Sequence, residues 1–75
     1  MGKKKVYIWA DADEKIGYGH FIRCLALADM LKDNFDCTFF TKAPTEYQWL
    51  EVESVCRLVP LPNDESRFSL FLNLL

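Results

Sequence analysis

The strongest constraint on the fold is a set of three short apolar runs separated by segments with helical periodicity. The runs are residues 6–10, 36–43 and 55–61. They are rich in β-branched and aromatic residues, and the first shows no alternation of polar and apolar positions, which is typical of a strand covered on both faces. We therefore predict three strands, the last of them ended by Pro60 and Pro62 because proline cannot donate to a strand ladder.

The segments between these runs predict three helices. Residues 20–33 carry so wide an apolar face that we expect this helix to be mostly buried, with Asn34 as its stop. Residues 47–54 are compatible with a short amphipathic helix that places Tyr47 and Leu50 on one side. Residues 65–75 form an unusually apolar last helix. Its predicted N-cap is Asn63 or Asp64.

An order of strand, helix, strand, helix, strand, helix favours the α/β class with a parallel sheet and right-handed crossovers. The expected architecture is a three-stranded Rossmann-like half-domain that spans residues 1–75 as one partial domain. In the usual strand order the first strand is central and has neighbours on both sides. Here its far edge is expected to have no partner.

Composition excludes several classes of protein. The chain has 75 residues and a net charge of −2, and Lys3, Lys4 and Lys5 are its only basic cluster, which argues against nucleic acid as a partner. Three widely spaced cysteines and one histidine support neither a disulfide framework nor a metal site, so we predict buried free thiols and no metal or cofactor. No signal peptide or membrane span is recognisable, and we expect a cytoplasmic protein.

The loop from Asp11 to His20 carries the candidate chemistry, because ligands of open parallel sheets bind at the carboxyl ends of the strands. Gly17 and Gly19 permit positive φ and close backbone approach, and the helix that follows offers free N–H groups to an anion. The dinucleotide fingerprint fails because its third glycine would fall on Ile22, and the Gly-Lys-Ser/Thr of a P-loop is missing.

This stretch resembles the start of the UDP-sugar hydrolases of the pseudaminic acid pathway, which are relatives of the spore-coat polysaccharide biosynthesis proteins. The residues that match the family signature are Ile16, Gly17, Gly19, His20, Arg23, Cys24, Leu25, Leu27 and Ala28. The resemblance covers about the first 43 residues. It departs at Trp9, where relatives commonly carry a basic residue. Family members have two Rossmann-like domains in the glycosyltransferase-B arrangement, and the second domain, which holds most of the UDP site, has no counterpart here.

The resemblance implies hydrolysis at the anomeric carbon of a UDP-linked amino sugar, with His20 activating water or steadying the leaving diphosphate. Arg23 either reaches a phosphate or, as we favour, pairs with Asp11 or Asp13. The two acids either orient His20 or bind a sugar hydroxyl, or they cap the loop. Tyr18 either stacks on a base or sugar or faces solvent.

Three interpretations follow for the whole chain. It is the N-terminal part of a nucleotide-sugar hydrolase that is inactive alone, or a non-catalytic binding or assembly module, or a glycosyltransferase-like fragment, and its apolar end favours truncation. The uncovered edge of the first strand and the apolar run 68–75 further predict a homo-oligomer, a symmetric dimer above all.

Overall fold

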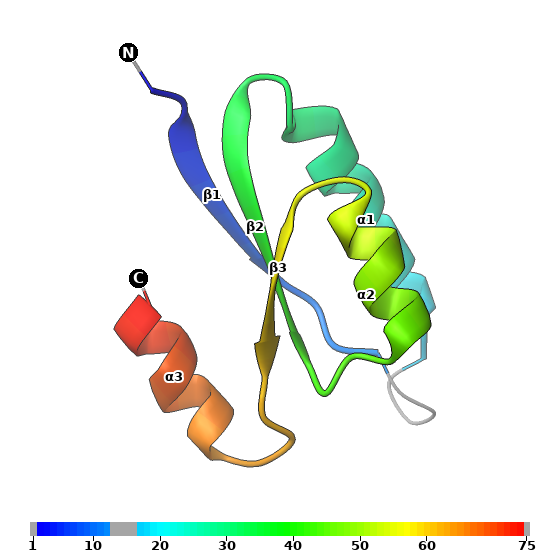
Figure 1. Ribbon diagram of the computed structural model, residues 1–75, viewed down its shortest axis with the longest axis vertical. Coiled ribbons are helices and arrows are strands. Elements are labelled where there is room, and N and C mark those ends of the chain that lie inside the picture. Colours follow the sequence, from blue (N-terminus) through cyan, green and yellow to red (C-terminus); the bar gives the residue numbers. More distant parts are fainter. Residues whose placement is uncertain (1, 13–16, 75) are drawn as a thin grey trace.

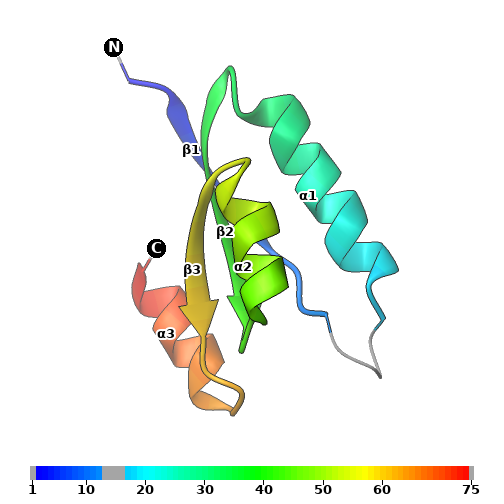
Figure 2. The same cartoon turned by 45° about the vertical axis from the view of Figure 1, so that its right-hand side comes forward.

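The computed structural model describes residues 2–12 and 17–74. Their elements are β1 (Lys4–Trp9), α1 (Gly19–Leu31), β2 (Phe35–Lys42), α2 (Glu46–Glu53), β3 (Arg57–Leu61) and α3 (Ser66–Leu74). The strands form one open parallel sheet in the order β1-β2-β3. Helices α1 and α2 cover one face of this sheet and α3 covers the other (Figures 1 and 2). The predicted α/β class and Rossmann-like half-domain are confirmed, as is the position of β1 at one edge.

The central strand β2 carries the core. Its residues from Cys37 to Thr41 are all buried, which is expected for a strand covered on both faces. Successive side chains of a strand point to opposite faces, so two neighbouring phenylalanines anchor helices on both sides. Phe39 packs edge-on against Phe21 of α1, with 5.3 Å between ring centroids, and Phe40 packs against Phe71 of α3 at 4.8 Å.

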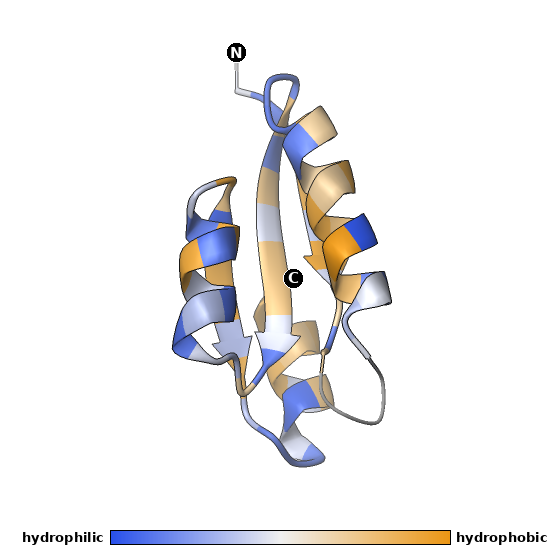
Figure 3. Cartoon of the chain, turned by 90° about the vertical axis from the view of Figure 1, so that its right-hand side faces the viewer, coloured by the Kyte–Doolittle hydropathy of each residue, from blue (hydrophilic) through white to orange (hydrophobic). Residues whose placement is uncertain are grey.

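Helix α1 is less buried than its sequence predicts. Phe21 and Ala28 are its only fully buried residues, whereas Ile22 and Met30 are 50% and 76% exposed. Figure 3 shows apolar residues on the outward side of this helix. The prediction of a mostly buried helix is wrong because α1 meets the sheet along one stripe, and none of the described residues covers its opposite side.

Helix α2 turns a different face to the core from the one predicted. Tyr47 and Leu50 are 70% and 65% exposed, and Gln48 and Val52 are buried instead. A capping box fixes this orientation: the Gln48 backbone N–H donates to Thr45 Oγ1 at 3.2 Å, and the Thr45 backbone N–H donates to Gln48 Oε1 at 3.0 Å. The oxygen of the buried amide is therefore satisfied, and Val52 follows Gln48 one turn later on the same face.

Strand β3 ends at Leu61 as predicted, directly before Pro62, but Pro60 lies within the strand and does not end it. The Ala43 N–H donates to the Leu61 carbonyl at 2.8 Å, so Leu61 faces β2. Because backbone groups alternate in direction along a strand, Pro60 faces away from β2, where no donor is needed. The strand begins at Arg57 rather than Val55, because the N–H groups of Val55 and Cys56 still bond to the Val52 carbonyl at the end of α2.

Helix α3 starts as predicted, with Asp64 as its cap. The carboxylate of Asp64 accepts the backbone N–H of Ser66 at 2.8 Å and also the Ser66 hydroxyl. These donors favour the charged carboxylate and lower the pKa of Asp64. No helix in the described part of the chain is long and apolar enough to cross a membrane.

The three cysteines are free thiols, but only Cys37 is fully buried, and Cys24 and Cys56 are half-buried. The prediction of buried thiols therefore holds for one of the three. Burial raises the pKa of Cys56 to about 11, so this thiol stays protonated at neutral pH.

Two threonine substitutions should change stability in opposite directions. The hydroxyl of Thr41 is buried and has no hydrogen-bond partner among the described residues, so Thr41→Val should raise the free energy of unfolding by about 1 kcal/mol. Thr45→Val removes the side-chain cap of α2 and should lower it by about 1 kcal/mol. Urea denaturation followed by circular dichroism measures both, and a loss of stability in Thr41→Val would contradict the packing described here.

Candidate functional site

The candidate site is a hollow of about 370 Å³ at the carboxyl edge of the sheet. It lies where β1 ends and where α1 and α3 begin (Figure 1). Its lining residues are Trp9, Ala10, Asp11, His20, Arg67 and Phe68. The hollow therefore brings together two of the residues singled out from the sequence, Asp11 and His20, and adds a cation from a distant segment.

Asp11 links the end of β1 to the end of β2. Its Oδ1 accepts the backbone N–H of Lys42 and the indole N–H of Trp9, both at 2.9 Å. The regular ladder between β1 and β2 ends one bond earlier, where the Ala10 N–H donates to the Phe40 carbonyl at 3.0 Å. At the point where β1 leaves the sheet, the side-chain carboxylate of Asp11 therefore accepts a backbone N–H of β2 in place of a backbone carbonyl. Asp11 is half-buried, and this arrangement supports the loop-capping role among the alternatives considered for it.

His20 is the second residue of α1, and its side chain is exposed at the rim of the hollow. Its Nε2 lies 3.6 Å from the Cys24 sulfur, one helical turn further along α1. No carboxylate among the described residues accepts a hydrogen bond from the ring. The imidazole is therefore free to meet a ligand from solvent, and Asp11 does not orient it directly.

Arg67 lines the hollow and was not singled out from the sequence. It lies in the first turn of α3, and its Nη1 donates to the Asp64 carbonyl at 2.7 Å. The guanidinium carbon stands 4.8 Å from the centroid of the Phe68 ring, within cation–π range. Its Nε is buried and has no hydrogen-bond partner in the described part of the chain. The sequence feature that could have identified Arg67 is its position after the third strand, because ligands of parallel sheets bind near the carboxyl ends of the strands.

The two glycines of the loop have different roles. Gly17 has a φ of +83°, the left-handed region that favours glycine. Gly19 is the first residue of α1, and a Cβ there would lie 3.3 Å from Arg23 Nη1, so the guanidinium packs over the helix start. Arg23 is exposed, lies outside the hollow and forms no ion pair with Asp11. Its other proposed partner, Asp13, lies outside the described residues, as does Ile16 of the family signature.

Tyr18 is separated from His20. It is 53% exposed and lines a second hollow of about 310 Å³ between α1 and α2, which also contains Tyr47 and Glu51. In that hollow the Tyr47 hydroxyl donates to Glu51 Oε1 at 3.0 Å. The structure thus places Asp11 and His20 at one hollow and Tyr18 at another. Gly17, Gly19 and Arg23 line neither of the two.

In the described part of the chain no side chain caps the amino terminus of α1, in contrast to that of α2. Tyr18, at the N-cap position, makes no side-chain cap hydrogen bond, and the first turn of α1 contains no acidic residue. Helix α2 has a capping box and Glu46 in its first turn. Because unpaired N–H groups and the helix dipole favour negative charge, the start of α1 is receptive to an anion.

Comparison of the chain with protein-family models, curated proteins and solved structures finds no match in any of the three. Within the described residues, no group of three or more histidine, cysteine or acidic side chains is arranged to hold a metal ion.

Asp11 and His20 should differ sharply in their effect on stability. Asp11→Ala removes an acceptor shared by two N–H groups and should cost about 1 to 3 kcal/mol. His20→Ala removes an exposed side chain and should change the free energy of unfolding by no more than about 0.5 kcal/mol. Thermal melts of both variants test this, and a large loss in His20→Ala would make His20 a structural residue instead.

Proposed function

We propose that the chain acts on nucleotide-linked sugars, as the N-terminal part of a hydrolase that releases UDP from an amino sugar. The observation that carries this proposal is the start of α1, which no described side chain caps, with His20 and Arg67 around one hollow at the carboxyl edge of a parallel sheet. A diphosphate needs donors and positive charge, and this hollow offers both. The resemblance of residues 11–28 to the UDP-sugar hydrolases supports the sugar nucleotide as the ligand.

The residues have distinct roles in this proposal. Arg67 and the first N–H groups of α1 hold the diphosphate, and Asp11 positions the loop through Trp9 and Lys42 without serving as a base. Among the described groups that line the hollow, His20 supplies an imidazole nitrogen that can accept a proton. The oxygen of water forms a bond to the anomeric carbon, the bond from that carbon to the diphosphate breaks, and His20 accepts the water proton while UDP leaves with the bonding electrons.

Arg67 should be needed for binding and Arg23 should not. The matched variants Arg67→Ala and Arg23→Ala each remove one guanidinium, but only Arg67 lines the hollow. Loss of a charge-assisted hydrogen bond should weaken UDP binding about tenfold or more in Arg67→Ala and leave it unchanged in Arg23→Ala. Chemical-shift titration with UDP measures this. Equal affinities in both variants would contradict the assignment of the hollow.

The isolated chain should bind UDP-amino sugars weakly and not turn them over. The described residues border the ligand from one edge of a sheet only, and catalysis requires groups held around the reacting centre. Release of UDP from UDP-N-acetylglucosamine, followed by coupled assay, should equal the uncatalysed rate. Turnover that disappears in His20→Ala would show instead that this chain is catalytic by itself. Binding without turnover in the presence of candidate partner chains would favour the non-catalytic module.

A further inference from the structure

The two edges of the sheet differ in their capacity to pair with another strand. The Ala10 N–H bonds to β2, so residues of even number in β1 face β2. Because backbone directions alternate, the N–H and C=O groups of Lys5, Tyr7 and Trp9 point outward from the sheet. In the described part of the chain no backbone group bonds to this edge. β1 therefore presents three complete pairs of donors and acceptors.

The opposite edge is blocked. On β3 the outward positions are Leu58 and Pro60, and proline provides no N–H at the second of them. Proline on an edge strand is a common protection against pairing with another chain. A head-to-tail contact between β1 of one copy and β3 of the next is therefore disfavoured, and with it an open chain of copies. Only contacts between like edges remain, and these close into a dimer.

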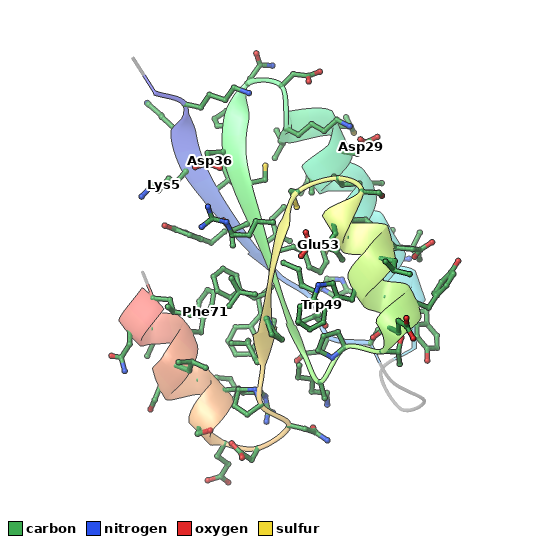
Figure 4. All side chains as sticks on the ribbon, viewed as in Figure 1. Lys5, Asp29, Asp36, Trp49, Glu53 and Phe71 are labelled. Carbon is green, nitrogen blue, oxygen red and sulfur yellow. The ribbon has the colours of Figure 1, made fainter. Side chains whose placement is uncertain are left out.

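The charges of β1 select the direction of that pairing. Three lysines stand at its start and Asp11 follows its end, so the strand is positive at one end and negative at the other. A parallel contact between two copies would place Lys4 and Lys5 beside their own equivalents, which is destabilising. An antiparallel contact places the lysines of one copy near the Asp11 end of the other. Figure 4 shows Lys5 extending from β1 on the side away from β2.

We propose that β1 pairs with β1 of a second copy of this chain, antiparallel and centred on Tyr7, to give a continuous six-stranded sheet. This register uses all three outward positions, because Tyr7 then faces Tyr7 and Lys5 faces Trp9 of the second copy. The two-fold axis is perpendicular to the sheet, so both α3 helices lie on the same face. Their exposed apolar side chains then lie on a shared surface and include Phe68, Leu70, Leu72 and Leu74.

The test uses Tyr7→Pro, which removes an outward N–H of β1 together with the Tyr7 ring. Proline at position 7 leaves the bonds between β1 and β2 intact, because Tyr7 does not face β2. Tyr7→Thr is the matched control: it removes the same ring but keeps the N–H. Sedimentation equilibrium at micromolar concentration should give twice the 8.8 kDa chain mass for the natural chain and for Tyr7→Thr. Tyr7→Pro should give the mass of one chain with a retained circular dichroism spectrum.

Hydrogen exchange on the natural chain tests the proposal without any substitution. The amides of Lys5, Tyr7 and Trp9 should become more protected as protein concentration rises, while the outward amide of Leu58 on β3 should not change. A natural chain that sediments as a monomer, a Tyr7→Pro variant that still forms dimers, or concentration-independent exchange at these three amides would overturn the proposal.

Discussion

Burial of β2 on both faces is the constraint on which the rest of the structure depends. Two neighbouring side chains, Phe39 and Phe40, point to opposite faces, and each holds one helix by ring contacts. Phe39 fixes α1 through Phe21, and Phe40 fixes α3 through Phe71. Both helices begin at the carboxyl edge of the sheet, so His20 and Arg67 come to flank the end of β1. Residues 47 positions apart in the sequence thereby meet at one hollow.

Much of this fold could be predicted from local patterns. The strands can be recognised from their apolar runs. The cap at Asp64 can be recognised because it bonds to Ser66, only two residues further along the chain. The faces of the helices were harder to predict. Tyr47 and Leu50 look like a buried pair, yet the capping box between Thr45 and Gln48 sets the phase of α2 and turns them to solvent. Periodicity shows which residues share a face but not which face meets the sheet.

Only the part of the candidate site around the start of α1 could be predicted from the sequence. The stretch that ends the loop and begins α1 contains two glycines and the histidine, and the positive φ of Gly17 agrees with the expectation for that turn. Arg67 could not be predicted because its position depends on α3 crossing to the second face of the sheet. No short-range pattern contains that crossing, since it follows from the demand that Phe40 be covered. The partner of Asp11 could not be predicted either, because Lys42 is 31 positions away in the sequence.

Trp9 connects the site to α3. Its ring lies 5.2 Å from Phe68 and 4.8 Å from Phe71, and its indole N–H donates to Asp11. No described residue of α3 is fully buried, so this helix depends on a few ring contacts and belongs to the low end of local stability. A ligand held between His20 and Arg67 would add a contact from α1 to α3. Binding would therefore stabilise the attachment of α3, because any ligand that prefers the docked helix shifts the equilibrium towards it.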